Sequence, residues 1–238
     1  MRMERFGRLQ ARLTGGTDGR GGGHGPLVVL LHGFGAPGDD LVGLTPMLDA
    51  PAGTRFLFPV GPLPLQMGYA ESRAWWMIDL EKLQRDRAAG RPLDLSEEIP
   101  KGLVEARGEV VALLEDATRR LGADPSRTII GGFSQGAMLA CDVAWRMERP
   151  FAGLVVLSGT LLARREWAPL LPKRKGLPVL QSHGSDDPLL PFAQAEALRT
   201  LLSQAGLLVD WVGFRGGHEI PPVVLTRLGG FLRSVLGR

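Results

Sequence analysis

A five-residue turn between two apolar segments constrains the fold of this chain more than any other feature. The turn is Gly132-Phe133-Ser134-Gln135-Gly136; residues 128–131 before it are typical of the end of a buried β-strand, and residues 137–141 after it of the start of a helix. A tight strand-to-helix turn holds its serine in an exposed, strained position, where the hydroxyl can serve as a nucleophile. Glycines suit both flanks because strand and helix pass close together and glycine has no Cβ to clash. The segment therefore predicts a strand, a candidate nucleophile at Ser134, and a helix.

The Gly-x-Ser-x-Gly pattern by itself is a weak indication of function. The chain has 33 glycines among its 238 residues, so a match somewhere by chance has a probability of roughly one in six. The assignment of Ser134 depends on whether the rest of the chain supplies a base, an acid and two donors for an oxyanion.

Composition excludes several classes of protein. Hydrophobic residues make up 44% of the chain, enough to bury a full core, which argues against disorder. The formal net charge is +3, the basic residues are scattered among acidic ones, and the run Lys173-Arg174-Lys175 is short enough to be a solvated loop. We therefore expect no nucleic-acid partner. Cys141 is the only cysteine, so an internal disulfide is impossible and a cysteine metal site is not expected.

The N-terminus and the hydropathy of the chain bear on its location. Residues 1–5 are strongly charged and lead into no apolar core, unlike a secretory signal. No apolar run in the sequence is long enough to cross a membrane. We expect a cytoplasmic protein with no stable membrane insertion.

Strand-like and helix-like segments alternate along the chain. We expect β-strands at 6–13, 27–31, 56–60, 127–132, 153–159, 177–184 and 207–214, and helices at 101–121, from 137, at 191–205 and at 222–236. Residues 14–25 form a glycine-rich turn, and the charged residues 80–101 a loop-like surface excursion or small lid. The alternation implies one α/β domain over residues 1–238, with a mostly parallel central sheet and helices on both faces.

A serine nucleophile needs a neighbouring base, and the chain has four histidines: His24, His32, His183 and His218. His24 lies in the glycine-rich turn and is expected to be an exposed loop residue, while His32 and His183 each end a strand. In the chain order nucleophile, acid, base, only His218 comes late enough, and two glycines before it let its loop bend toward the serine. His218 is therefore the candidate base. No pair of histidines has helical ligand spacing, so no metal site is expected.

The acid that orients the base should lie in a loop after a strand between the serine and His218. Asp186 and Asp187, which precede Pro188, occupy such a loop; Asp187 is 53 residues after Ser134 and 31 before His218. Both gaps suit one or two strand–helix units. A carboxylate before proline is also a common start of a turn, so the residues alone divide the choice between the two aspartates almost evenly.

Two backbone N–H groups should point at the oxyanion. One belongs to Gln135, at the N-terminus of the helix after the serine, where the helix dipole also favours negative charge. The other is expected from Phe34, because the glycines of His32-Gly33-Phe34-Gly35 let the backbone approach closely. His32 is then structural and bonds within the loop.

Adjacent tryptophans at Trp75 and Trp76 are costly to expose. They are expected either to anchor the core or an edge strand, or to form a wall of the pocket that holds an acyl group, since binding clefts are mainly apolar with aromatic lining. We expect one ring to serve each purpose.

Six motifs together make the chain resemble one family of enzymes. The motifs are Leu31-His32-Gly33-Phe34-Gly35, Phe58-Pro59, Arg73-Ala74-Trp75-Trp76, Gly132-Phe133-Ser134-Gln135-Gly136, Asp187-Pro188-Leu189-Leu190-Pro191 and Gly217-His218. From about Pro26 to Leu236 the chain resembles the phospholipase/carboxylesterase family of α/β-hydrolases, which also contains the acyl-protein thioesterases. Phe133 and Gln135 around the serine make the match far more specific than the bare pattern.

The resemblance implies an α/β-hydrolase fold and a set of roles. It implies Ser134 as nucleophile, Asp187 as acid, His218 as base, and the N–H groups of Phe34 and Gln135 as oxyanion donors, with no cofactor and no metal. The same resemblance favours Asp187 over Asp186, because the family's acid directly precedes the proline. Trp75, Trp76 and Leu189 are expected to bind substrate. The chain departs from the family at Trp76, where phenylalanine or tyrosine is commoner, and in residues 80–101.

The expected function is that of a serine carboxylesterase, which cleaves a small acyl ester through an acyl-enzyme. An acyl-protein thioesterase or a lysophospholipase is the alternative, and the family spans all three substrates. A non-catalytic binding protein of the same fold would be expected to lack a triad member, and none is missing here. The sequence also leaves a homodimer open.

Overall fold

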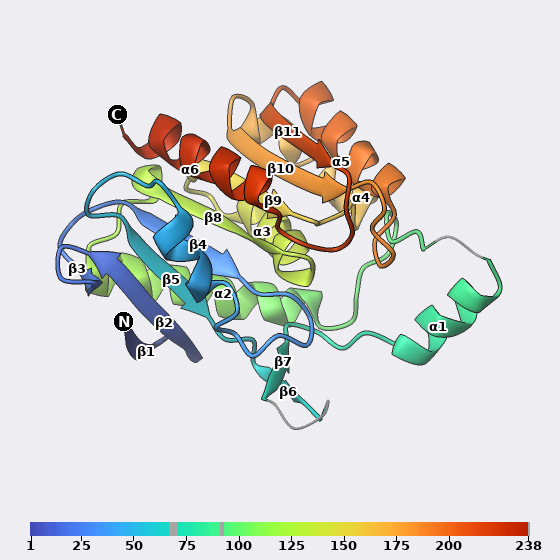
Figure 1. Ribbon diagram of the computed structural model, residues 1–238, viewed down its shortest axis with the longest axis horizontal. Helices are drawn as coiled ribbons and strands as arrows, with labels where there is room; N and C mark the ends of the chain where they lie inside the picture. The colour runs from blue at the N-terminus through green and yellow to red at the C-terminus, as the bar shows by residue number, and fades with distance from the viewer. Residues whose placement is uncertain (67–70, 91–92, 238) are drawn as a thin grey trace.

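The computed structural model describes residues 1–66, 71–90 and 93–237. Its main sheet has nine strands, of which eight lie in the order β1-β2-β5-β4-β8-β9-β10-β11 while β3 pairs with β2 (Figure 1). Their bounds are β1 Arg2–Phe6, β2 Leu9–Gly16, β3 Arg20–Gly22, β4 Leu27–Leu31, β5 Arg55–Pro59, β8 Thr128–Phe133, β9 Gly153–Leu157, β10 Pro178–Gly184 and β11 Leu208–Phe214. Along this order, the neighbouring strands β5, β4, β8, β9, β10 and β11 pair in parallel, and β1 and β2 add an antiparallel edge. The mostly parallel sheet of an α/β-hydrolase fold is thus confirmed.

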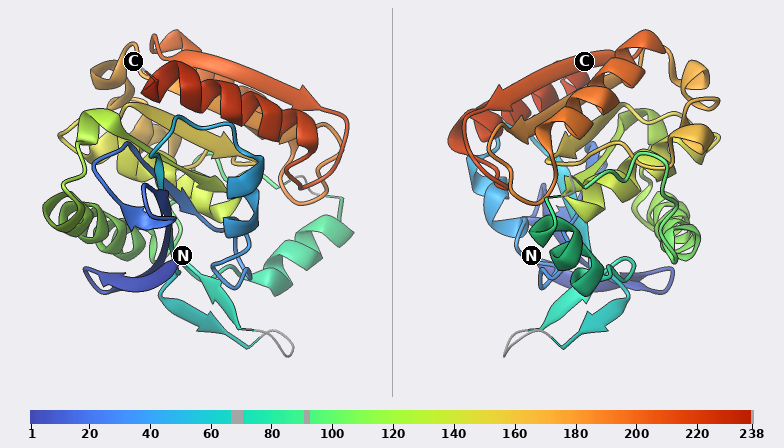
Figure 2. Two further views of the ribbon diagram at one scale, coloured as in Figure 1. Left: turned by 60° about the vertical axis from the view of Figure 1, so that its left-hand side comes forward. Right: turned by 90° about the vertical axis from the view of Figure 1, so that its right-hand side faces the viewer.

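Helices cover both faces of this sheet. Their bounds are α1 Leu80–Ala88, α2 Leu103–Leu121, α3 Gln135–Arg146, α4 Arg164–Trp167, α5 Phe192–Gln204 and α6 Pro222–Leu236, with 3₁₀ turns at Val42–Met47, Pro125–Arg127 and Leu171–Arg174. Buried side chains of α2, α3 and α5 form one core cluster with one face of the sheet, and those of α6 form a second cluster with the other. Figure 2 shows α2 and α6 on opposite sides of the strands.

Several boundaries follow from local chemistry. The apolar strands in the parallel part begin and end within two residues of the positions expected from the sequence. Helix α2 ends at Gly122, which has φ +57° and ψ +38°, a left-handed conformation that glycine adopts without a Cβ clash. The sequence predicts this end correctly.

The expectation of one N-terminal strand at 6–13 is wrong in its bounds. Residues 2–16 form a hairpin of β1 and β2, turned at Gly7, whose φ is +56°. The glycine permits a tight turn near the start of the expected strand, most of which belongs to β2. A short strand, β3, lies within the expected glycine-rich turn at 14–25.

The expectation of a loop-like excursion at 80–101 is also wrong in part. The charged residues after Asp79 form helix α1, which projects from the body of the molecule in Figure 1. Its Arg85 and Glu81 pair across one helical turn at 3.6 Å, the type of contact that stabilises a polar helix. A second hairpin, of β6 Leu63–Leu65 and β7 Ser72–Ala74, precedes this helix. The periodicity of the sequence predicts neither element.

Candidate active site

The turn after β8 places Ser134 in a strained conformation. Its φ is +54° and its ψ is −119°, a region that residues with a Cβ rarely occupy. The backbone N–H of Ser134 donates to Leu157 O of the neighbouring strand at 2.8 Å, which holds the turn in place. The hydroxyl therefore stands where strand β8 ends and helix α3 begins, as the sequence predicts.

The two glycines of the turn are required by close approach. A Cβ at Gly136 would lie 2.2 Å from Leu31 O and 2.5 Å from His32 O. One at Gly132 would lie 2.5 Å from Leu31 O and from the carbonyl carbon of Gly136. These are backbone atoms, so no side-chain rotation relieves the clash.

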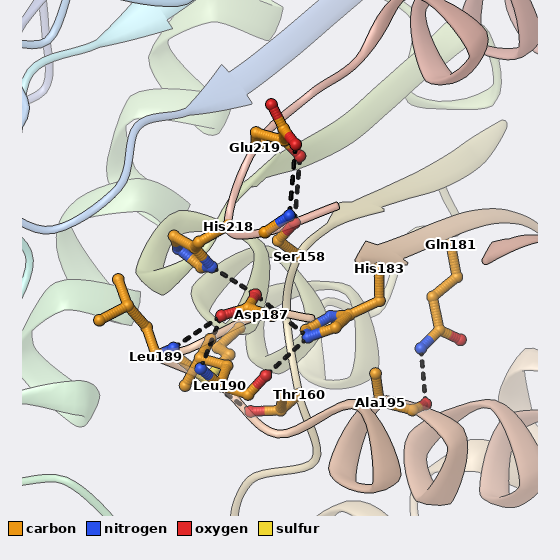
Figure 3. A network of polar contacts seen from close by, with 12 residues as sticks. Ser158, Thr160, Gln181, His183, Asp187, Leu189, Leu190, Ala195, His218 and Glu219 are labelled. Atoms are coloured by element: carbon orange, nitrogen blue, oxygen red, sulfur yellow. Dashed lines mark hydrogen bonds and ion pairs between the residues drawn. The ribbon is translucent and has the colours of Figure 1, made fainter. Parts of the chain in front are cut away.

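The structure brings His218 against one of the two candidate aspartates. His218 Nδ1 lies 2.6 Å from Asp187 Oδ2, and the Asp187 side chain is fully buried (Figure 3). The other oxygen of Asp187 accepts the backbone N–H groups of Leu189 at 2.8 Å and Leu190 at 2.9 Å. Asp186 is exposed, and its backbone N–H donates to Gly216 O. The geometry therefore places Asp187, and not Asp186, against the candidate base.

Hydrogen bonding keeps the buried Asp187 ionised. Burial alone would raise the pKa of Asp187, but hydrogen bonds from His183, His218 and the Leu190 N–H outweigh it and hold this pKa well below its ordinary value of 3.8. An ionised Asp187 can only accept hydrogen bonds, so the hydrogen between it and His218 belongs to His218 Nδ1. His218 Nε2 is then the ring atom available to accept a proton.

A tightly packed loop carries His218. A Cβ at Gly184 would lie 2.2 Å from Gly217 O, so the end of β10 touches the backbone just before the histidine. The His218 ring packs on Phe133 with centroids 4.8 Å apart, and its side chain is 12% exposed. Ser134 and His218 both line the same cavity.

The loop after β4 presents the second candidate oxyanion donor. Gly35 N–H donates to Arg73 O, and Arg73 N–H donates to Ala36 O, both at 2.9 Å, which ties the loop to β7. Within the described part of the chain, the N–H groups of Phe34 and Gln135 have no acceptor, and both residues line the cavity with Ser134. The residues that carry the two expected donors therefore line the same cavity as the serine.

His32 is a structural residue of this loop. Its Nε2 accepts the Gly61 N–H at 2.8 Å, so the ring hydrogen is on Nδ1, which donates to Gly33 O at 2.7 Å. Burial lowers the pKa of His32, which favours this neutral form. His32 O accepts the indole N–H of Trp75 at 2.9 Å.

The two tryptophans have different surroundings, as expected of the pair, but the expectation that Trp75 binds substrate finds no support in the structure. Trp75 is 1% exposed, packs in the core and does not line the cavity, whereas Trp76 does. The side chain of Gln135 holds both: its oxygen accepts the Trp75 N–H at 3.0 Å and its amide donates to Trp76 O at 2.9 Å. The sequence identifies Gln135 for its backbone N–H, but nothing in it signals this role of the side chain.

The cavity beside Ser134 has a volume of about 500 Å³ and is largely apolar. Leu189 lines it, as the sequence predicts. Much of the wall comes from the excursion between Trp76 and Lys101, including Ile78, Leu93 and Leu95. Its returning segment is anchored to the body by hydrogen bonds from Ala163 N–H to Glu98 O at 3.1 Å and from Arg164 N–H to Ser96 O at 2.7 Å.

Sequence reasoning misses a further set of residues that line the cavity. They include the apolar residues Ile78, Leu93, Leu95, Met138, Leu162 and Leu190. Only Met138 and Leu190 carry a local signal, because each follows a candidate catalytic residue by three or four positions. Among the described residues, no cluster of three His, Cys, Asp or Glu side chains is placed to hold a metal ion, and no helix is long and apolar enough to cross a membrane.

Comparison with known proteins adds a family and a set of relatives. A family model described as Phospholipase/Carboxylesterase matches residues 20–236. Acyl-protein thioesterase 1 of Eremothecium gossypii is 30% identical over 218 residues, covering 87% of each chain, and that of Aspergillus fumigatus is 27% identical over 231 residues, covering 90% of this chain and 89% of that protein. The crystal structure of esterase PE8 matches with a TM-score of 0.80 and 28% identity over 96% of this chain and 99% of that one. The Bacillus cereus carboxylesterase shares the fold, with a TM-score of 0.70 and 22% identity over 95% and 94% of the two chains.

Proposed function

Because the chain belongs to the phospholipase/carboxylesterase family, we propose that Ser134, His218 and Asp187 are the catalytic triad with which this serine hydrolase cleaves carboxylic esters. One observation supports the proposal: the strained Ser134 and His218, which contacts the buried Asp187, line one largely apolar cavity. The three residues follow the chain order of nucleophile, acid and base in α/β-hydrolases.

The reaction follows from the positions of these groups. His218 Nε2 takes the proton of Ser134 Oγ as the oxygen attacks the ester carbonyl. The N–H groups of Phe34 and Gln135 donate to the oxyanion, and His218 returns the proton to the departing alcohol. Water then attacks the acyl-enzyme by the same route. Asp187 holds the His218 hydrogen on Nδ1 throughout and stabilises the charged imidazole.

The cavity is the binding site for the acyl chain. Its wall is largely apolar, with aliphatic residues and Trp76, and the charged residues Asp40, Asp79, Glu98 and Lys101 also line it. Each methylene transferred from water into such a wall contributes about 0.8 kcal/mol. We therefore expect kcat/KM to rise with acyl length until the cavity is filled.

An acyl-protein thioesterase is the second candidate function, because two relatives that cover most of this chain carry that name. A thioester and an oxygen ester of the same acyl chain place the same carbonyl against Ser134 and differ in the leaving group. Matched pairs of such substrates, compared by kcat/KM at each chain length, distinguish the two activities. A higher kcat/KM for oxygen esters across the series supports a carboxylesterase.

A fluorophosphonate probe tests the triad itself. The probe should label the wild-type protein at Ser134, and Ser134→Ala should neither be labelled nor turn over p-nitrophenyl esters above background. Ser126→Ala is a matched control, because Ser126 lies in a 3₁₀ turn at the opposite end of β8 and does not line the cavity. Labelling of Ser134→Ala, or full turnover by it, contradicts the proposal.

The remaining expectations stay predictions. They are a single domain over residues 1–238, a cytoplasmic location, independence from metal and cofactor, the absence of a nucleic-acid partner, and a homodimer as an open alternative.

A further inference from the structure

His183 lies on the other side of Asp187 from His218 (Figure 3). It is near the end of β10, is fully buried, and packs edge-on against Phe192 with ring centroids 6.2 Å apart. A fully buried histidine is uncommon enough to require hydrogen-bond partners. The proposed reaction does not use it.

The surroundings of His183 determine where its ring hydrogen lies. Nε2 is 2.9 Å from Leu190 O and 3.3 Å from Asp187 Oδ2. A carbonyl oxygen and an ionised carboxylate only accept hydrogen bonds, so Nε2 must carry the hydrogen. Nδ1 is buried and has no partner among the described residues. A neutral ring with its hydrogen on Nε2 is the form that fits this site.

The same hydrogen therefore faces two acceptors that both belong to the acid loop. The shorter contact, to Leu190 O, holds the loop that donates the Leu189 and Leu190 N–H groups to Asp187 Oδ1. The longer contact reaches Oδ2, the oxygen bonded to His218 Nδ1. His183 thus touches Asp187 directly and also restrains the turn that holds it.

We propose that His183 is a positioning residue for the triad: by donating to Leu190 O and Asp187 Oδ2 it fixes the carboxylate in the orientation that His218 requires. The proposal rests on the assignment of His218 as base. Without the His183 donor, Oδ2 keeps only its contact with His218, and the turn whose N–H groups hold Oδ1 loses its hydrogen bond to β10. The 2.6 Å contact with His218 is then less firmly directed. A base that is misplaced by a fraction of an ångström loses much of its effect on rate.

Other charged groups act on this cluster only from a distance. Asp186, on the same loop, and Glu219, next to His218, are both exposed to solvent. On the side of α5 and β11, the Arg199 guanidinium stacks on Trp211, which packs on Phe192, so two aromatic rings separate it from His183. Among the described residues, the polar groups in contact with the His183 side chain are the Asp187 carboxylate and the Leu190 carbonyl.

The wild-type protein allows a test that needs no turnover. In a ¹⁵N-histidine-labelled sample, NMR over about pH 5 to 9 follows the His218 ring and the His183 Nε2 hydrogen separately. Since both rings donate to Asp187 Oδ2, the His183 Nε2–H resonance should shift with the same midpoint as His218, and this response should disappear in Asp187→Asn. A His183 resonance that stays constant while His218 titrates, or no protected Nε2–H signal at all, overturns the proposal.

Substitutions provide the second test. His183→Phe removes the donor, and its kcat should fall about 10- to 100-fold with little change in KM. The His218 Nδ1–H resonance should also be displaced, and the pH profile of kcat should change. His183→Gln places an amide N–H near the position of Nε2 and should recover most of kcat and the wild-type pH profile. Ser182→Ala is the matched control, because Ser182 is also buried on β10 and its hydroxyl has no partner among the described residues; it should behave as wild type.

A structural role alone predicts other results. In that case folded His183→Phe loses thermal stability but keeps the wild-type pH profile and His218 resonance, which contradicts the proposal. If His183→Phe does not fold, the wild-type titration and the activity of His183→Gln test the positioning role of His183. Fluorophosphonate labelling of Ser134 separates this proposal from the proposed function: labelled Ser134 with an unresponsive His183 rejects only the role of His183.

Discussion

The side-chain oxygen of Gln135 accepts the backbone N–H of Trp75 at 3.0 Å, across 60 residues of sequence. The same side chain donates to Trp76 O, so the residue that follows the proposed nucleophile also holds the aromatic wall of the cavity. Gln135 is 1% exposed, so both hydrogen bonds are shielded from bulk solvent. The proposed oxyanion donor and the pocket wall are thereby parts of one hydrogen-bonded unit.

Replacing the Gln135 side chain should separate its support of the cavity wall from the role of its backbone N–H as oxyanion donor. Gln135→Ala keeps the backbone N–H but leaves a buried N–H at Trp75 and a buried C=O at Trp76 unpaired, at a cost of about 1–3 kcal/mol each. We expect a lower Tm and about a tenfold loss of kcat/KM for long-chain esters, with a smaller loss for acetyl esters. Gln204→Ala, at the exposed end of α5, should change neither. Equal losses for short and long esters contradict a specific effect on the wall.

The two aspartates before Pro188 should differ sharply in their effect on rate. Asp187→Asn removes the carboxylate that holds the His218 hydrogen on Nδ1, and kcat on p-nitrophenyl esters should fall roughly 10³- to 10⁴-fold. Asp186→Asn alters an exposed side chain and should remain within about twofold of wild type. The reverse order would assign the acid to Asp186.

The depressed pKa of Asp187 predicts how stability depends on pH. A carboxyl whose pKa is lower in the folded state stabilises that state above its ordinary pKa of 3.8, and this contribution disappears as the pH falls toward the folded value. The difference in unfolding free energy between wild type and Asp187→Asn should therefore be constant near neutral pH and decrease below about pH 4. Urea unfolding of both proteins between about pH 7 and 3 measures it. A difference independent of pH over this range would falsify the assignment of a lowered pKa.

Alanine substitutions at two glycines should change the stability of the fold in opposite directions. In Gly136→Ala the new Cβ meets Leu31 O at 2.2 Å, so β4 or α3 must move, and we expect a loss of roughly 3 kcal/mol or more of stability together with activity. Gly230 lies in α6, where a Cβ would meet nothing within 4 Å beyond the backbone of its own helix and its chain neighbours. Gly230→Ala should therefore stabilise the helix by about 0.5–1 kcal/mol. Urea denaturation gives both values.

Leu189 should contribute to acyl binding and not to the chemical step. It lines the cavity and is 47% exposed, so Leu189→Ala removes apolar contact area but keeps the backbone N–H that donates to Asp187. KM for long-chain esters should rise roughly three- to tenfold, with kcat nearly unchanged. Leu208→Ala, at an exposed position of β11 outside the cavity, is the control and should leave KM unchanged. A fall in kcat for Leu189→Ala would indicate that the acid loop had moved.

Much of the fold is predictable because its signals are local. The apolar strands of the parallel sheet and the helices between them are visible as runs and periodicities, and the end of α2 is visible as Gly122. The two hairpins and α1 escape prediction for physical reasons. A turn at Gly7 interrupts an apparently continuous strand, and α1 is a polar helix with little apolar periodicity.

The family, the parallel sheet and the chain order of Ser134, Asp187 and His218 can be read from the residues, because they depend on short motifs and on spacing along the chain. The resemblance favoured Asp187 over Asp186, and the folded structure places Asp187 against His218. Which of two adjacent tryptophans lines the cavity, and that His183 contacts the acid, emerge from the fold alone. The physical reason is that neighbouring residues project in different directions, so their roles depend on elements distant in sequence. The residues of a motif do not specify those directions, because the packing of β10, α3 and the loops around them sets them.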